Sequence, residues 1–280
     1  LAFARRDFAG ARRALETSAE LAEVPLLNLL LAARAAQAEG DVGARDALLR
    51  RAIETHPKET LAVGVTRAEL EIDEGHWEAA LATLLVARRE APRDGAVLRL
   101  LAQALAAIPD WTGLTELVAD LRRASALPEE EIDRLERRAW LERLAAAGET
   151  EGSAADEVLA VWAAVPKALE HDAGLVACCA ERLDAVGAGG AAEALLQAEL
   201  KQAWNPRLVD LYGRVRGDDA ARQAKTAATW ARSRGDDALL ALARGRIAQR
   251  RERFEEARHH YAASLALRET PEACAELGRL

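Results

Sequence analysis

The sequence predicts an all-α protein, an α-solenoid in which helical hairpins stack side by side. Its commonest residues, Ala, Leu, Arg and Glu, are good helix formers. No segment shows the alternation of apolar and polar residues that marks a half-buried strand. A short turn motif also recurs at a nearly constant spacing in the N-terminal part, and such an internal period is the signature of a stacked repeat array.

The repeat is carried by one position of the turn motif, which holds an apolar residue in four successive units: Phe8, Val42, Trp77 and Trp111. These positions are 34, 35 and 34 residues apart. Pro57 and Pro92 keep the same period, since they are 35 residues apart. Independent markers therefore agree on the length of one unit. Trp77 and Trp111, which occupy the aromatic position of the repeat, are expected to lie in the core.

The third unit shows what one period contains. Residues 61–74 and 77–90 form two amphipathic segments, and Gly75 lies between them as a turn signal. One stripe of the second segment consists of apolar residues that are three or four positions apart: Ala80, Leu84 and Ala87. The small Ala68 on the first segment would let this stripe approach closely. This combination is the tetratricopeptide pattern, so we expect the hairpins to follow a right-handed superhelix.

The middle of the chain is also helical, but its period drifts. Pro128 and the three glutamates that follow it are expected to start a long helix, because acidic side chains stabilise the N-terminal end of the helix dipole. This helix should end near Ala147. The polar break at residues 148–153 is the predicted hinge. Further helices are expected over residues 156–165, 172–186, 190–202, 206–215 and 218–234.

The C-terminal part returns to the regular pattern. A first helix is expected over residues 238–249, with Gly245 at its close-packing position, and Pro271 opens a further helix in which Gly278 repeats that role. The second-helix positions between them are Phe254, Ala257, Tyr261 and Ser264. We therefore divide the chain into regular repeats (1–127), irregular helical hairpins (128–235), and a C-terminal repeat with the start of a capping helix (236–280).

Charge and hydropathy argue against several classes of partner. The net charge is −8 and no basic stripe stands out, which argues against nucleic acid. No apolar run approaches the roughly 18–20 residues of a membrane span. Because the chain starts at Leu1 and contains no Met, we expect it to be a piece of a longer protein. The three cysteines, Cys178, Cys179 and Cys274, do not fit a disulfide framework and are expected to be buried thiols.

Four blocks of sequence are more specific than the general repeat pattern. They are PLLN (25–28) leading into AARAAQ (32–37), Trp204 with LVDLYG (208–213), SLAL (264–267), and PEA (271–273) leading to AELG (275–278). With these blocks in this order, the chain resembles the HemY family, the tetratricopeptide proteins of proteobacteria that are linked to protohaem biosynthesis. The resemblance covers nearly the whole chain.

The resemblance implies a protein of the bacterial inner membrane, with two N-terminal spans that would precede Leu1 and a repeat domain on the cytoplasmic side. It also implies an association with late steps of haem synthesis, without a defined enzymatic reaction. The chain departs from the family pattern at Cys274, where an aromatic residue is more usual, and at Arg45, where the repeat prefers Ala. Arg45 leaves open how the second hairpin packs.

Two histidines are candidates for a haem or metal ligand. His259 and His260 each follow a glutamate, Glu255 or Glu256, by four residues, so an axial haem ligand or a metal pair is conceivable. Neighbouring residues of a helix point about 100° apart, however, so the two rings would not easily share one site. The alternative is a pair of solvated or interface histidines, and the haem-attachment motif CxxCH is absent.

No catalytic constellation stands out. The phosphate-binding GxxxxGK[ST], the zinc-binding HExxH and the nucleophile elbow GxSxG are absent. His171 and Cys178 are seven residues apart and could share a helix face, but nothing in the sequence supplies a third group to orient them, and a core cysteine is the alternative. The sequence therefore predicts no catalytic residue, no metal site and no cofactor.

The surface left for function is formed by the first helices of successive hairpins, which line a concave groove in tetratricopeptide arrays. The residues that we place there are Arg34, Gln37, Glu69, Asp73, Arg99, Gln103, Arg246, Gln249 and Arg250. For each of them, an ordinary solvated helix surface is the alternative. Arginines in such a groove could hold acidic or extended segments of another protein through bidentate hydrogen bonds.

The predicted function is that of a membrane-tethered scaffold, not an enzyme, which binds other proteins, among them enzymes of late haem synthesis, through its concave surface. Two alternatives stay open at this stage. One is a general adaptor of the cell envelope unrelated to haem. The other is a haem or porphyrin carrier that uses His259 or His260.

Overall fold

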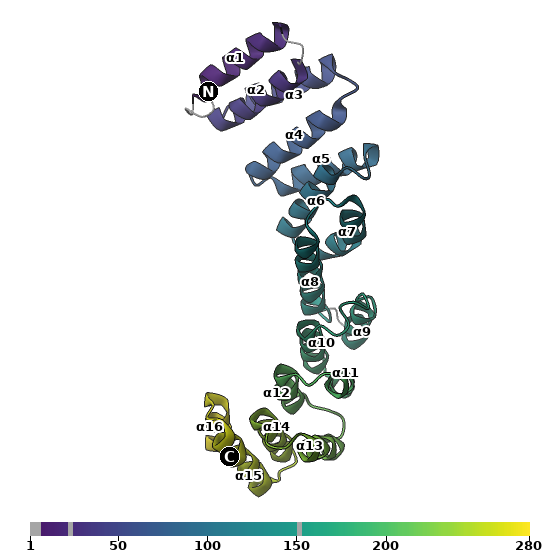
Figure 1. Cartoon of the computed structure of the whole chain (residues 1–280), viewed down its shortest axis with the longest axis vertical. Coiled ribbons are helices and arrows are strands. Elements are labelled where there is room, and N and C mark those ends of the chain that lie inside the picture. Colours follow the sequence, from purple (N-terminus) through teal and green to yellow (C-terminus); the bar gives the residue numbers. More distant parts are fainter. Residues whose placement is uncertain (1–6, 22–24, 150–152) are drawn as a thin grey trace. The chain divides into compact units, whose positions relative to one another are not determined.

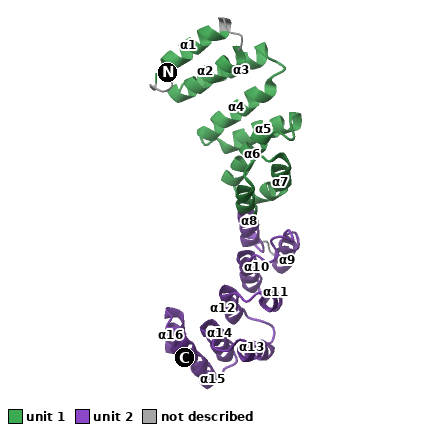
Figure 2. Ribbon diagram, in the orientation of Figure 1, with its two compact units in different colours: residues 1–136 green, residues 137–280 purple. Residues whose placement is uncertain are grey.

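The structure, a computed structural model, describes residues 7–21, 25–149 and 153–280. In this part of the chain every regular element is an α-helix, and many consecutive helices pair as hairpins (Figure 1). The chain forms two compact units, Leu1–Glu136 and Arg137–Leu280 (Figure 2). The prediction of an all-α solenoid built from tetratricopeptide-type hairpins is confirmed, whereas the right-handed superhelical course stays a prediction.

Unit 1 contains a leading helix and three hairpins, which are α2 with α3, α4 with α5, and α6 with α7. Its helices are α1 (Phe8–Leu21), α2 (Pro25–Glu39), α3 (Val42–Thr55), α4 (Thr60–Asp73), α5 (Trp77–Glu90), α6 (Gly95–Ala107), α7 (Trp111–Ala124) and the first part of α8 (Glu129–Ala146). Below, "first helices" are the first members of successive hairpins, and in unit 1 these are α2, α4 and α6.

Unit 2 begins within α8 and continues with α9 (Ala154–Ala163), α10 (Ala173–Ala185), α11 (Gly189–Gln202), α12 (Pro206–Arg214), α13 (Ala220–Arg234), α14 (Ala238–Arg250), α15 (Phe254–Leu267) and α16 (Pro271–Gly278). Its first helices are α8, α10, α12, α14 and α16. Successive first helices pack against each other directly, as α10 does with α12 and α12 with α14.

The third hairpin matches its prediction closely. Helix α5 has the predicted bounds, α4 begins and ends one residue earlier than expected, and Gly75 between them has a φ of 76°. A positive φ of this size is accessible to Gly at little cost, which explains the tight turn. The predicted stripe of α5, which consists of Ala80, Leu84 and Ala87, is buried. Ala68 on α4 is fully buried as well.

Short polar side chains explain where many of the helices begin. An Asp or Asn just before the first turn accepts hydrogen bonds from N–H groups that have no partner within the helix. Asp94, for example, accepts from the backbone N–H groups of Ala96 and Val97 at 2.9 and 3.0 Å. The other residues that cap a helix in this way are Asp7, Asp41, Asp110, Asp172, Asn205, Asp219 and Asp237.

The predicted helices of the middle region are present, with ends that differ by a few residues. Of the predicted hinge at 148–153, residues 150–152 lie outside the described residues. The two compact units divide elsewhere, between Glu136 and Arg137 inside α8. The division into three parts at residues 127 and 235 stays a prediction.

Close approach between helices depends on glycine at two places in unit 2. A Cβ added at Gly245 would lie 2.3 Å from the Cε1 atom of Tyr261, which confirms the close-packing role predicted for this glycine. A Cβ at Gly213 would lie 2.5 Å from the Cα atom of Ala243, so α12 and α14 touch backbone to backbone there. The same role predicted for Gly278 is wrong for the described residues, because no atom lies within 4 Å of a Cβ built at that position.

Two other predictions about burial need correction. Cys274 is exposed, because it lies on the outward side of the short helix α16, whereas Cys179 is buried and Cys178 partly buried. Trp77 and Trp111, expected in the core, are only partly buried, since both lie at the first position of a helix beside a turn.

Replacing Gly213 by Ala should lower the free energy of unfolding by about 1–3 kcal/mol, because the added Cβ would force α12 and α14 apart. The matched control is Gly64→Ala in α4, where an added Cβ meets no atom within 4 Å. That change should raise stability by about 0.5–1 kcal/mol, since Ala is the better helix former. Chemical denaturation followed by circular dichroism measures both, and equal effects of the two variants would contradict the close contact at Gly213.

Candidate functional site

In unit 1, several of the predicted groove residues bond to each other. Arg34 on α2 forms an ion pair with Glu69 on α4. The amide nitrogen of Gln37 lies 3.4 Å from the carbonyl oxygen of Leu70, and its amide oxygen accepts a hydrogen bond from Arg45 at 2.8 Å. These side chains therefore connect two successive first helices, although Arg34 is still exposed.

The structure shows how the second hairpin accommodates Arg45 in place of the usual Ala. Its guanidinium donates hydrogen bonds to Glu74 at 2.7 Å, to Asp46 at 2.8 Å and to Gln37. Helices α2 and α3 pack normally as a hairpin. Arg45 thus ties the second hairpin to the end of α4, and the hairpin forms without the Ala that the repeat prefers.

Three other predicted groove residues of unit 1, Asp73, Arg99 and Gln103, are exposed. None of them makes a side-chain hydrogen bond or ion pair with another part of the chain that the structure describes. They are therefore available to a ligand, and their role in binding stays a prediction.

In unit 2, the structure corrects the picture of Arg246. This residue is buried, and it bonds to Asp210 at 2.6 Å and to Glu276 at 3.0 Å. It therefore bridges α12, α14 and α16. Because its guanidinium is already paired with carboxylates on both sides, Arg246 stabilises the stack and is not an open groove residue.

The neighbouring groove candidates of α14 also have internal partners. Gln249 accepts a hydrogen bond from the hydroxyl of Tyr261 at 2.6 Å. Arg250 donates to the carbonyl oxygen of Gly213 at 2.7 Å and to the side-chain oxygen of Gln223 at 3.0 Å. Unlike Arg246, Arg250 forms no ion pair with a carboxylate among the residues that the structure describes.

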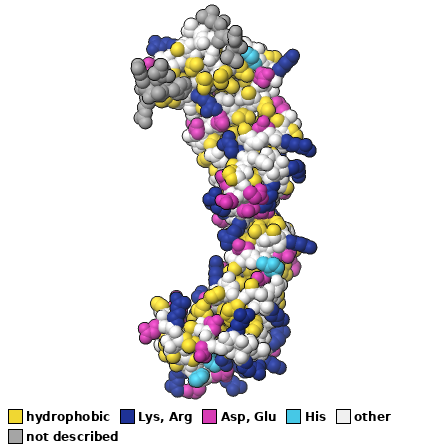
Figure 3. Space-filling view, viewed as in Figure 1, with side chains coloured by type: hydrophobic (Ala, Val, Ile, Leu, Met, Phe, Trp, Pro, Cys, Tyr) yellow, Lys and Arg dark blue, Asp and Glu magenta, His cyan; other side chains and the backbone are white. Residues whose placement is uncertain are grey.

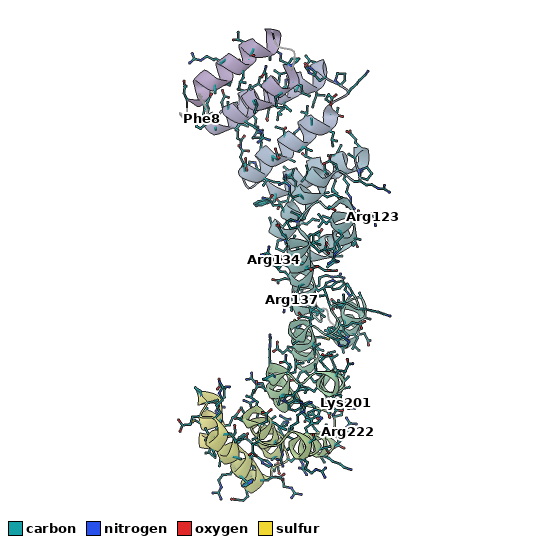
Figure 4. The ribbon with its side chains drawn as sticks, viewed as in Figure 1. Phe8, Arg123, Arg134, Arg137, Lys201 and Arg222 are labelled. Carbon is teal, nitrogen blue, oxygen red and sulfur yellow. The ribbon has the colours of Figure 1, made fainter. Side chains whose placement is uncertain are left out.

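Arginines connect successive first helices at a spacing of about one repeat. Arg34 and Glu69 are 35 residues apart. Arg137 on α8, labelled in Figure 4, and Asp172 at the start of α10 have the same separation. The Arg137 pair is bidentate, with distances of 2.7 and 3.1 Å. The first-helix surface is therefore partly used for intramolecular bonds, and its ligand-binding capacity lies in the side chains that these bonds leave free.

An open depression of unit 1 lies between α3 and α5, with α4 as its floor, and we call it the α3–α5 groove. Its volume is about 800 Å³. Ile53 and Val86 on its walls are 44% and 56% exposed, and a Cβ added at Gly64 on its floor would meet nothing within 4 Å. Apolar and charged side chains are interspersed on the face of the molecule shown in Figure 3. Sequence reasoning missed this groove, because the gap depends on how far two hairpins separate.

A second open pocket lies on the first-helix surface of unit 2 and has a volume of about 510 Å³. We call it the arginine pocket, and its lining residues are Arg214, Arg216, Arg246, Gln249, Arg250 and Glu276. Sequence reasoning named three of the six, and the structure adds Arg214 and Arg216 from the end of α12 and Glu276 from α16. The missed signal was the GRVRG segment at 213–217, which places two arginines beside the close contact at Gly213.

The histidine candidates are placed differently from each other. His259 is exposed, whereas His260 is buried, and its Nε2 atom lies 3.8 Å from a carboxylate oxygen of Glu256. Burial, with a further contribution from Arg244, lowers the pKa of His260 to about 4. Among the described residues, no group of three or more His, Cys, Asp and Glu side chains could hold a metal ion.

The structure does not bring His171 and Cys178 together. The Nδ1 atom of His171 lies 2.9 Å from Glu199, and this carboxylate raises the pKa of the imidazole. The thiol of Cys178 points to the carbonyl oxygen of Leu141 at 3.7 Å, and burial raises its pKa. A thiol with a raised pKa is a poor nucleophile at neutral pH, so Cys178 has the character of a core residue.

No protein-family model matches the chain. Among curated proteins the chain is similar to Protein HemY of Escherichia coli K12, with 27% identity over 273 residues that cover 98% of this chain and 68% of the relative. Protein HemY of Shigella flexneri matches with the same identity and coverage.

Solved structures with similar helices include a tetratricopeptide repeat protein from Parabacteroides merdae, with a TM-score of 0.37, 13% identity, and coverage of 90% of this chain and 97% of that one. The TPR domain of P58(IPK) gives a TM-score of 0.29 and 14% identity, with coverage of 99% and 94%. No helix among the described residues has both the length and the apolar character needed to cross a membrane.

Stability should depend on pH through His260. Its pKa is about 4 in the folded state and about 6.5 when unfolded, so the unfolded chain binds a proton more tightly. The resulting contribution to stability is constant above about pH 6.5 and is lost as the pH falls towards 4, by about 2 kcal/mol at pH 5. His260→Gln should remove this part of the acid sensitivity, whereas His259→Gln should keep it. Thermal unfolding at several pH values between 7 and 4.5 measures this, and parallel profiles for all three proteins would contradict it.

Proposed function

We propose that this chain is the repeat domain of a HemY-type scaffold, which binds other proteins and has no enzymatic reaction of its own. Its partners would include enzymes of late haem synthesis at the bacterial inner membrane, with attachment through N-terminal spans outside this chain and the repeats on the cytoplasmic side. The similarity to Protein HemY across 98% of the chain supports the family assignment. The hairpin stacks support the binding role, since such arrays expose long surfaces suited to protein partners.

The observation that carries the binding role is the α3–α5 groove. A volume of about 800 Å³ falls within the range of small-molecule sites, but this groove is open and is bounded by three helices instead of being enclosed. Its exposed apolar residues, Ile53 and Val86, are separated by the bare floor at Gly64. A helix or extended segment of another protein would cover these side chains and remove their apolar surface from water.

The link to haem depends on the resemblance and on the name of the similar proteins. A direct haem-carrier role gains little from the structure, since His260 is buried beside Glu256 and the exposed His259 belongs to no group of three or more potential metal ligands among the described residues. The general envelope adaptor is the alternative that an experiment must separate from the haem-specific scaffold.

Photo-cross-linking in bacterial cells tests the scaffold. The cross-linker benzoylphenylalanine is placed at Ile53 or Val86 in the groove, and at Leu159 in unit 2 as a control, since Leu159 is similarly exposed at 41%. We expect defined protein adducts from the two groove positions and few from Leu159. Ferrochelatase or other late haem enzymes in the adducts would support the haem-specific role, and unrelated envelope proteins would support the adaptor.

A variant that fills the groove provides the second readout. Gly64→Leu projects a side chain into open space without disturbing neighbours, because a Cβ at this position meets nothing within 4 Å. It should reduce adduct formation by about fivefold or more, since loss of an apolar contact of about 1 kcal/mol has that effect. Gly64→Ala is the matched control and should leave the adducts nearly unchanged. Undiminished adducts in Gly64→Leu would show that partners do not occupy the groove.

A further inference from the structure

Four arginines from two first helices and the segment between α12 and α13 meet in the arginine pocket of unit 2. Arg214 ends α12, Arg216 follows it, and Arg246 and Arg250 lie one turn apart on α14. Glu276 is the only acidic side chain that lines the pocket itself. The balance of charge in the pocket therefore depends on which of these arginines are neutralised by carboxylates nearby.

Two of the arginines are neutralised. Arg246 bonds to Asp210 at 2.6 Å and to Glu276 at 3.0 Å, and Arg214 bonds to the second oxygen of Asp210 at 2.7 Å. Both carboxylates are thereby used. Among the residues that the structure describes, Asp210 and Glu276 form no ion pair with either of the other two arginines.

The other two arginines are not neutralised. Arg250 bonds only to uncharged oxygens, those of Gly213 and Gln223, with a weaker contact to the carbonyl of Arg214 at 3.5 Å. The side chain of Arg216 forms no ion pair with any residue that the structure describes, while its backbone N–H donates to Asp184 at 2.8 Å. Asp184 therefore contacts the backbone of Arg216 and does not pair with its guanidinium.

The environment of Arg250 favours the approach of an anion. Burial lowers the pKa of Arg250, the nearby charges of Arg216 and Arg246 lower it further, and Asp184 opposes them. A cation that is partly removed from water and faces two other cations is unfavourable unless an anion approaches it. A carboxylate fits this need, because a guanidinium presents paired N–H donors that match the two carboxylate oxygens.

We propose that the arginine pocket binds carboxylates of an acidic segment of a partner protein, with Arg216 and Arg250 as the groups that receive them. The open volume of about 510 Å³ admits several residues of a chain, more than a single small ion requires. This proposal rests on the proposed function, in that the ligand is part of another protein. It adds the chemistry of the segment, which is rich in Asp or Glu.

The test uses the whole 280-residue chain and three synthetic octapeptides as probes. The first alternates Glu and Ala and is blocked at both ends. The second replaces every Glu by Gln, and the third is the Gln peptide with a free C-terminal carboxylate. Isothermal titration calorimetry at low salt measures each affinity, since added salt screens an exposed ion pair. We expect the Glu peptide to bind and the blocked Gln peptide not to bind.

Arg216→Gln is the decisive variant, because the side chain of Arg216 has no described partner whose loss would unfold the protein. It should weaken binding of the Glu peptide by about tenfold, as expected for one charge-assisted bidentate contact. Arg216→Lys should give an intermediate affinity, since it keeps the charge and loses the paired donors. Arg258→Gln on α15 makes the same change in net charge on an exposed surface elsewhere in unit 2, and it should change the affinity less than twofold.

Equal affinity for the Glu and blocked Gln peptides, or an unchanged affinity in Arg216→Gln, would overturn the proposal. Binding of only the peptide with the free C-terminus would also overturn it, in favour of a site for chain ends. The cross-linking experiment in unit 1 keeps the two proposals distinguishable. Adducts at the α3–α5 groove without peptide binding would support the scaffold function and contradict the acidic segment as a ligand. Peptide binding without adducts would support the arginine pocket as a binding site and contradict the α3–α5 groove as one.

Discussion

Contact between successive first helices is the constraint on which the rest of the structure depends. A single hairpin cannot bury its apolar stripe, so each hairpin needs its neighbour. In unit 2 the contact between first helices combines close backbone packing at small residues with hydrogen bonds from arginines. Small residues let the backbones touch, as Gly213 and Ala243 do, and arginines then reach across the contact. Arg182 and Arg250 each donate to carbonyl oxygens at the C-terminal end of the preceding first helix, those of Ala147 and Gly213. These carbonyls lack partners within their own helix, and a cation at that end also stabilises the helix dipole.

The same contacts decide what the surface can offer to a ligand. A side chain that holds two first helices together is not free, however well its position fits a groove, and Arg246 is the clearest case. The charged side chains that stay open to a ligand are those with no internal ion pair among the described residues, and they include Arg99 in unit 1 and Arg216 in unit 2. Binding by this chain is therefore expected to depend on a few free charges and on the gap over Gly64, where neighbouring hairpins separate.

The fold could be predicted closely from the sequence, because its signals are local. A turn glycine such as Gly75 and a capping residue such as Asp94 mark helix ends within a few positions, and a period of 34 or 35 residues then fixes the architecture. The site was harder to predict, because the partner that neutralises an arginine lies a whole repeat away. The spacing of 36 residues between Arg246 and Asp210 was visible in the sequence and, with hindsight, was a sign of an internal pair. The α3–α5 groove had no such sign, since it reflects a distance between hairpins that no residue type specifies.

The directional bonds of the arginines also explain how similar hairpins adopt one defined position relative to their neighbours. The stacking surfaces consist largely of Ala and Leu, and apolar contact is non-directional, so such surfaces discriminate poorly between one relative position and another. An arginine that must meet a carboxylate on a neighbouring first helix does discriminate, because a shift by one residue removes its bonds. Arg137 with both oxygens of Asp172, and Arg246 between Asp210 and Glu276, therefore define the position of one hairpin against the next. Apolar burial supplies the energy of the stack, and the arginines supply its register.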